Sequence, residues 1–309
     1  MPYLKCLRPT EAQDVLLEIH SGICGNHPGA ATLAFKALRQ GYYWPTMKED
    51  AKTLVRKCDA CQRHGNLIHV PAEQQSFIFG VSPFFQWGMD ILGPLPMAKG
   101  QRKFLLVAID YFTKWVEAEP LATITTAKIQ SFTWKNIICR FGIPRVLITD
   151  NGRQFDNHSF KAFCSSYHID HRLTSVAHPQ SNGQAEVTNR TILWDLKTRL
   201  EKEKGIWADE LPNVLWAYHT TPRDSTGETP FKLSFGMEAV VPVEVLNESG
   251  RMKANQLDIS TTNAELDLLD GVRERSAMRM MAYKRRAAKY FNRRVKPRVF
   301  QPGDLGLRK

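Results

Sequence analysis

The spacing of apolar and polar residues changes part-way along the chain. In the first part, apolar residues recur at helical spacing, which predicts short helices over Glu11–Ile19 and Ala30–Gln40 and from Thr46 to about Lys57. The stretch that follows has little periodicity and contains a proline and a glycine. The pattern therefore predicts a small helical domain over residues 1–66, followed by a linker over residues 67–82.

Strand-like patterns begin after this linker. The pattern predicts strands at Trp87–Leu92, Phe104–Asp110 and Trp115–Leu121, and we expect the second to be covered on both faces because it is continuously apolar. Further along, it predicts helices at Thr126–Phe141, Ser159–Tyr167, about Gly183–Lys204 and Trp207–Tyr218, and strands at Val146–Thr149 and Ile169–Leu173. This order predicts an α/β fold over residues 83–246, with a mixed five-stranded sheet and flanking helices.

The positive charge is concentrated at the C-terminal end. Residues 251–309 contribute +9 of the formal net charge of +11. A helix is predicted from about Asn263 to Val295, and ten basic residues and one acid lie between Arg273 and Lys296. Concentrated positive charge favours a polyanionic partner, most often nucleic acid. The alternative is a solvated helix face, and in both cases we expect residues 247–309 to form a basic helical extension.

Two classes of protein are disfavoured by the same sequence. The longest apolar run, Phe104–Ile109, is far shorter than the roughly 20 residues of a membrane-spanning helix. The sequence does not open with a basic segment followed by an apolar stretch, so its start does not resemble a secretory signal. Six cysteines in 309 residues do not make a disulfide scaffold. Only Cys58 and Cys61 form a close pair, and their spacing favours a metal or redox site.

A possible zinc site lies in the first domain. His20, His27, Cys58 and Cys61 follow the pattern H-x6-H-x30-C-x2-C. Four nitrogen and sulfur ligands suit tetrahedral zinc, and one ion could stabilise a domain whose own core is small. A redox pair would be expected at a strand–helix junction of a thioredoxin-like fold, which this pattern does not predict. Cys24 lies between the histidines and could compete as a ligand.

Three acids lie at positions in the predicted strands and long helix where they could form a catalytic site. Asp90 lies inside the first strand after the linker, Asp150 ends the fourth, and Glu186 lies in the first turns of the long helix. Such carboxylates can hold two divalent cations about 3.5–4 Å apart, and would repel one another without them. The alternative for Asp150, which precedes Asn-Gly, is a turn former. Asp110 also ends a strand, and we interpret it as a structural turn residue.

Six short motifs carry a resemblance to a known family. They are Gly41–Met47, Cys58–Gln62, Trp87–Asp90, Asp110–Trp115, Thr149–Gly152 and Gly183–Glu186. Together they resemble the integrase of gypsy-type LTR retrotransposons, from about residue 3 to the last residue. The resemblance implies an RNase H-like core whose catalytic acids are Asp90, Asp150 and Glu186. It also implies that zinc uses the two histidines rather than Cys24.

The resemblance further implies metal-dependent phosphoryl transfer on DNA, in 3′-end processing and strand transfer, with a structural Zn and two Mg or Mn ions. The implied partners are element-end and target DNA and further copies of the chain. The implied location is the nucleus, after assembly in a cytoplasmic particle.

We expect Asn189 and Arg190, one turn after Glu186, to contact phosphates from a neighbouring helix face. Expected DNA contacts in the basic extension are Lys284, Arg285, Arg286, Arg293 and Arg294.

The sequence departs from the family at its end. A small β-barrel follows the core in the family, starting near a segment similar to Phe300–Arg308, and this sequence stops there, with Gly306 where a β-branched residue is expected. We therefore expect a truncated barrel and a fragment of a polyprotein. One alternative is a domesticated or decayed integrase that binds nucleic acid without integrating it. Another is an RNase H-type nuclease, which does not account for the zinc ligands.

Overall fold

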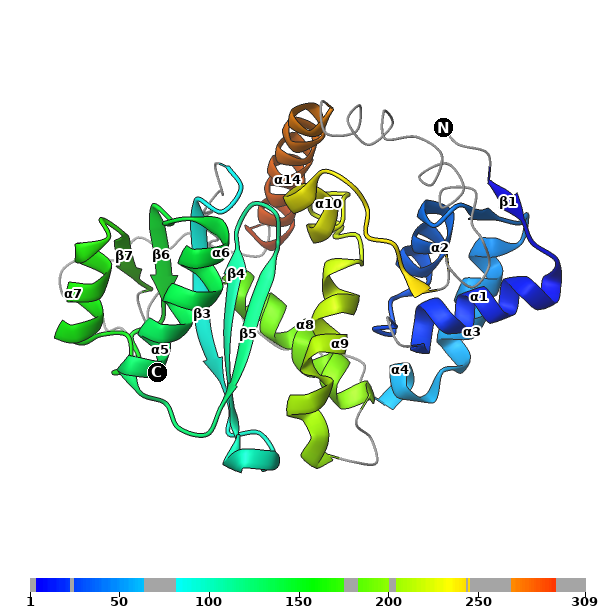
Figure 1. Ribbon diagram of the computed structural model, residues 1–309. Coiled ribbons are helices and arrows are strands. Elements are labelled where there is room, and N and C mark those ends of the chain that lie inside the picture. The colour runs from blue at the N-terminus through cyan, green and yellow to red at the C-terminus, as the bar shows by residue number, and fades with distance from the viewer. Residues whose placement is uncertain are drawn as a thin grey trace, which may run out of the picture.

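A computed structural model describes residues 4–22, 25–63, 82–174, 183–199, 204–242, 244 and 268–292. The N-terminal helices and the five-stranded sheet lie at opposite sides of the molecule, and α8 and α9 lie between them (Figure 1). The predicted α/β class, with a mixed five-stranded sheet and a preceding helical segment, is confirmed. The exact domain boundaries stay predictions.

The N-terminal segment folds around a small apolar core. Its helices are α1 (Pro9–Ser21), α2 (Ala30–Arg39), α3 (Met47–Lys57) and α4 (Asp59–Arg63), and β1 (Lys5–Cys6) pairs in parallel with β2 (Tyr42–Tyr43). Leu16, Leu33 and Tyr42 are at most 2% exposed. The three predicted helices are therefore confirmed to within a few residues, whereas the short strands and α4 were not predicted.

The main sheet has the strand order β5-β4-β3-β6-β7. Its strands are β3 (Gln86–Leu92), β4 (Phe104–Asp110), β5 (Val116–Leu121), β6 (Val146–Thr149) and β7 (Asp170–Leu173). The first three pair antiparallel, whereas β6 is parallel to both β3 and β7. Leu106 and Ala108 of β4 belong to one apolar cluster, and Leu105 and Val107 belong to another. Both faces of β4 are therefore covered, as its continuous apolar pattern predicted.

Helices cover the two faces of the sheet. On one face lie α5 (Thr126–Phe132), a π-helical turn (Thr133–Ile138), α6 (Cys139–Phe141) and α7 (His158–Ser166), and on the other lie α8 (Gly183–Arg199) and α9 (Trp207–His219). The helix predicted from Thr126 to Phe141 is thus interrupted by a π-helical turn. Asn157 caps α7 by accepting a hydrogen bond from the Phe160 amide at 2.9 Å.

The N-terminal segment docks on the chain that follows α9. Arg39 of α2 forms ion pairs with Glu228 and Glu238 at 2.5 and 2.6 Å. The ammonium of Lys36 is 3.1 Å from the Thr221 hydroxyl, to which it donates. Val241 joins the apolar core of the N-terminal segment. Polar and apolar contacts therefore both fix α2 against the second domain.

The predicted basic helix is confirmed as α14 (Leu269–Asn292), and one of its sides is packed rather than solvated. Arg273 donates to the Leu233 carbonyl at 3.1 Å, on the adjacent α10 (Pro230–Phe235), and Met280 is 2% exposed. No helix among the described residues is long and apolar enough to cross a membrane. The strand expected at Phe300–Arg308 lies outside the described residues.

Asp110 acts as a structural turn residue at the end of β4. It is fully buried and accepts hydrogen bonds from the Phe84 amide at 3.1 Å and from the amide and hydroxyl of Thr113, both at 2.7 Å. Burial raises the pKa of Asp110 to about 6, although these donors oppose the shift. The carboxylate therefore joins the start of β3 to the turn after β4.

We expect Asp110→Asn to destabilise the protein by about 1–3 kcal/mol. The amide has one acceptor oxygen where the carboxylate has two, so a buried donor loses its hydrogen-bond partner. The midpoint of urea unfolding at pH 8, above the pKa of about 6, measures this loss. Asp14→Asn, an exposed position on α1, is the control and should leave the midpoint unchanged. Equal midpoints for both variants would contradict the structural role.

Candidate active site and metal centre

The four predicted zinc ligands meet at one point. His20 lies near the end of α1, His27 in the loop before α2, Cys58 at the end of α3 and Cys61 in α4. Their ligand atoms all lie within 4.8 Å of one another. His27 has a left-handed backbone with φ 47°, and its amide donates to the His20 carbonyl at 2.9 Å. This turn directs both imidazoles to the same point.

The distances fit a tetrahedral ion. Zinc bonds of about 2.0–2.1 Å to nitrogen and about 2.3 Å to sulfur imply edges of about 3.3 Å between nitrogens and about 3.6 Å between nitrogen and sulfur. His20 Nε2 and His27 Nδ1 are 3.3 Å apart, Cys58 Sγ is 3.3 Å from His27 Nδ1, and Cys61 Sγ is 3.5 and 3.8 Å from the two nitrogens. These four edges therefore fit a tetrahedral zinc ion. Cys24 lies outside the described residues.

The electrostatics of this cluster also suit a cation. Burial and the neighbouring Cys58 raise the pKa of Cys61 to about 12, so two thiolates are stable here only beside a positive charge. Burial and the neighbouring His27 lower the pKa of His20 to about 4, which keeps its imidazole neutral and able to donate a lone pair to a metal. The donor set is thus that of a closed, structural zinc site.

The elements that carry the three acids are neighbours in the fold. β3 and β6 are parallel, with Gly88 opposite Ile148, and Asp90 follows Gly88 by two residues on β3 while Asp150 directly follows the end of β6. Helix α8, which carries Glu186, packs against β3. The side chain of Glu186 lies outside the described part of the chain. The backbone therefore brings all three elements together.

A hydrogen bond from α8 holds Asp90 in place. Asn189 Nδ2 donates to Asp90 Oδ2 at 2.6 Å, and the Ile91 amide donates to Asp90 Oδ1 at 2.8 Å. Asn189 is three residues after Glu186, so the two share one helix face. This contact therefore places the Glu186 side of α8 beside Asp90.

The structure gives Asn189 a contact that the sequence analysis did not expect. Asn189 is only 4% exposed and its amide donates to Asp90, so in this geometry it positions a carboxylate, and its contact with a phosphate stays a prediction. Its neighbour Arg190 is exposed, and its phosphate contact stays a prediction. The sequence did contain a signal for this contact. Asn189 follows Glu186 by three residues, and that spacing keeps two residues on the same helix face.

Asp150 is held by a local turn. Its Oδ1 accepts a hydrogen bond from the Gly152 amide at 3.0 Å, so Asp150 is a turn former as well as a candidate ligand. The Thr149 hydroxyl donates to the Asp150 carbonyl at 3.0 Å and lies 2.9 Å from His171 Nε2 on β7. Burial lowers the pKa of His171, which favours the neutral ring. The sequence analysis did not single out His171, because nothing in the local pattern relates it to Asp150.

The expected DNA contacts of α14 differ in exposure. Arg285 and Arg286 are exposed. Lys284 is partly buried, and burial lowers its pKa to about 8. Arg293 and Arg294 lie outside the described residues. The exposed pair therefore fits a role in binding a polyanion, whereas Lys284 faces the rest of the protein.

Comparisons with known proteins agree with this arrangement. The family described as integrase zinc binding domain matches residues 7–66, and the integrase core domain matches residues 81–179. The Pro-Pol polyprotein of feline foamy virus is 29% identical over 252 residues, or 81% of this chain and 20% of that protein. The gypsy retrotransposon integrase-like protein 1 of Bos taurus is 26% identical over 264 residues, or 85% of this chain and 51% of that protein.

A solved structure shows the same fold. The simian T-cell lymphotropic virus intasome in complex with the PP2A regulatory subunit B56 gamma has a TM-score of 0.51 at 19% identity, over 74% of each chain. The chain therefore carries the zinc-binding and core domains of an integrase. Its relatives include retroviral polyproteins and a gypsy retrotransposon integrase-like protein, in line with the sequence motifs. It spans about a fifth of the viral polyproteins it matches.

We expect one zinc ion per chain, lost in Cys58→Ser together with the folded state of the N-terminal domain, because the ligand set is closed by four protein side chains. Elemental analysis and near-UV circular dichroism measure both effects. Cys139→Ser removes an exposed cysteine and is the matched control. If zinc is retained in His27→Ala but lost in Cys24→Ala, the zinc ligand is Cys24 rather than His27.

Proposed function

We propose that this chain is a retrotransposon integrase that carries out metal-dependent phosphoryl transfer on DNA, in 3′-end processing and strand transfer. The observation that carries the proposal is the parallel pairing of β3, which contains Asp90, with β6, which Asp150 directly follows, together with the hydrogen bond from Asn189 of α8 to Asp90. Glu186, one turn before Asn189 in the sequence of α8, is the proposed third carboxylate. The proposal thus joins three acids that are far apart in sequence.

The residues present suit two Mg or Mn ions, because hard divalent cations prefer carboxylate oxygens. Bound ions would activate a water or a 3′-hydroxyl and stabilise the leaving oxygen. The protein's own part is to fix the ligands. Asn189 and the Ile91 amide orient Asp90, and the Gly152 amide orients Asp150. Such outer partners set the geometry and the basicity of metal ligands.

The proposed partners are element-end DNA, target DNA and other copies of the chain. The exposed guanidinium groups of Arg190, Arg285 and Arg286 support DNA binding, since phosphate contacts supply most of its affinity. The similarity to an intasome chain supports assembly of several copies. Nuclear localisation, after assembly in a cytoplasmic particle, follows from the same proposal.

We expect Asp150→Asn to abolish Mg-dependent cleavage and joining of element-end DNA while leaving the fold intact. An amide keeps the acceptor for the Gly152 amide but removes one charge from the metal ligands. Asp156→Asn, an exposed acid paired with Lys161, is the matched control and should keep full activity. Joining by Asp150→Asn at the parental rate would refute the assignment, and an inactive parent would favour a non-integrating, DNA-binding descendant.

Asn189→Ala should lower the rate of DNA joining about 10–100-fold, because loss of a partner to a metal ligand typically costs that much. Its effect should be partly relieved by higher Mg concentrations, which a purely structural defect would not show. Rates measured across a Mg titration, with unfolding midpoints alongside, separate the two. A rate equal to that of the parent would mean that the contact with Asp90 is dispensable.

The double variant Arg285→Gln/Arg286→Gln should bind duplex DNA more weakly and lower the slope of log affinity against log salt by about 1.8, since each phosphate contact contributes about 0.9. Fluorescence anisotropy at several salt concentrations measures this slope. Lys128→Gln/Lys135→Gln removes two exposed charges from the opposite face of the sheet and serves as the control. If the two double variants give equal slopes, Arg285 and Arg286 do not contact DNA. The charges of α14 would then serve solubility.

A further inference from the structure

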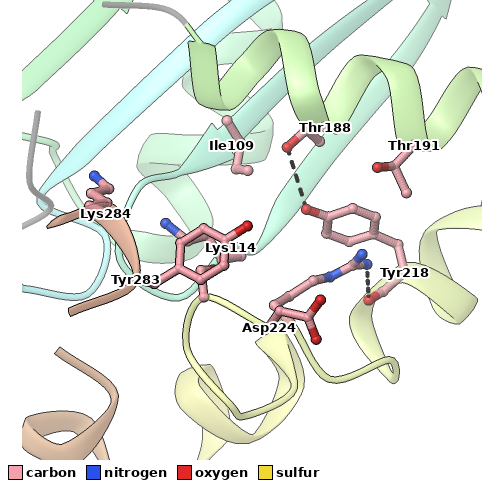
Figure 2. A pocket seen from close by; sticks show the side chains of 10 residues that line it. Ile109, Lys114, Thr188, Thr191, Tyr218, Asp224, Tyr283 and Lys284 are labelled. Carbon is pink, nitrogen blue, oxygen red and sulfur yellow. Dashed lines mark hydrogen bonds between the residues drawn. The ribbon is translucent and has the colours of Figure 1, made fainter. Parts of the chain in front are cut away.

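A cavity of about 290 Å³ lies where α14 meets the core domain, and none of the proposed metal ligands lines it. Figure 2 shows side chains from the β4–β5 turn, α8, α9 and α14 around this space. Its size is near the lower end for small-molecule sites. It therefore suits one small ligand and is far too small for a DNA duplex.

Three cationic side chains line this pocket, and each comes from a different element. Lys114 follows β4 and is 6% exposed, and its ammonium donates to the Tyr111 carbonyl at 2.5 Å and contacts Met280 Sδ at 3.3 Å. Burial, together with the positive charge of Lys284, lowers the pKa of Lys114 to about 7. Two ammonium groups thus share a poorly solvated space, and an anion there would relieve their repulsion.

Arg223 adds a donor without a partner. Its Nη2 donates to the Tyr218 carbonyl at 2.7 Å, and its guanidinium carbon stacks 3.4 Å from the centre of the Tyr218 ring. Its Nε is buried and has no hydrogen-bond partner among the described residues. Asp224 is the single carboxylate of the lining, so positive groups outnumber it. A buried donor with no partner favours an acceptor in the pocket.

The pocket also offers an aromatic surface. Tyr283 is 44% exposed and extends from α14 toward the centre of the pocket, where its ring lies in front of Lys114 (Figure 2). The Thr188 hydroxyl and the Tyr218 hydroxyl are 3.4 Å apart on the opposite wall. A ring beside clustered cations is the combination that binds unpaired nucleotides, through base stacking and phosphate contacts.

We propose that this pocket binds a single phosphate-bearing nucleotide, with its anionic and polar groups met by Lys114, Arg223 and Lys284 and its base against Tyr283. The nucleotide has two possible sources with the same chemistry, a free nucleoside phosphate and the unpaired end of a DNA strand. The site lies outside the proposed metal centre. It therefore does not depend on the proposed catalysis.

The test uses the full 309-residue chain with its zinc and without Mg, and a fluorescent dinucleotide with a 5′-phosphate as the probe. Lys284→Gln should weaken binding about tenfold or more, because hydrogen bonds to charged groups are strong. Tyr283→Ala should weaken it about fivefold or more through lost stacking. Lys289→Gln, an exposed lysine on the same helix, is the matched control and should stay within about twofold of the parent.

Thermal unfolding of each variant checks that α14 remains in place. Equal binding of the dinucleotide without its phosphate, or equal affinities of Lys284→Gln and Lys289→Gln, would overturn the proposal. Strong competition by a blunt duplex, which offers no unpaired nucleotide, would also overturn it. Competition by a free nucleoside monophosphate supports the small-molecule source, and competition by the unpaired 5′ end alone supports the DNA source.

Discussion

The burial of α8 against the sheet is the contact on which the rest of the structure depends. Ile192 and Leu196 of α8 are 0% and 4% exposed and pack in one apolar cluster with β4 and α9. Asn189 of the same helix holds Asp90 at 2.6 Å, and the ring of Trp194 lies 5.8 Å from that of His27, edge to face. One helix therefore contacts the proposed active site, the metal centre and, through Thr188 and Thr191, the nucleotide pocket.

The two domains are joined by charged contacts as well as by apolar ones. Arg39 binds Glu228 and Glu238 while these side chains are only about one-fifth exposed, so the ion pairs are partly shielded from solvent. Partly buried, hydrogen-bonded pairs are costly to break because an unpaired charge remains behind. Loss of zinc would therefore affect more than the first domain, since the segment it stabilises also covers residues after α9.

The positive charge of the C-terminal helix has two different environments. On one side of α14, Met280 and part of Lys284 pack toward the core, and on the other, Arg285 and Arg286 face solvent. Exposed guanidinium groups attract a duplex from a distance, although salt screens that attraction. Lys114 at the pocket is less screened because it is only 6% exposed. The same helix could therefore bind DNA non-specifically on one side and a single nucleotide on the other.

The sequence by itself determined most of the longer elements and the candidate zinc ligands and acids, because apolar period and ligand spacing are local properties. The short strands β1 and β2 and helix α4 were not predicted. Tertiary structure decided what surrounds them. Asn189 points to Asp90, 99 residues away, and Lys114 meets Met280, 166 residues away, so neither contact has a local signature. Lys284 belonged to a basic stretch in the sequence, yet packing of α14 against the core turned it toward a pocket. Helical spacing shows which residues share a face, but only the packed neighbours decide which face is buried.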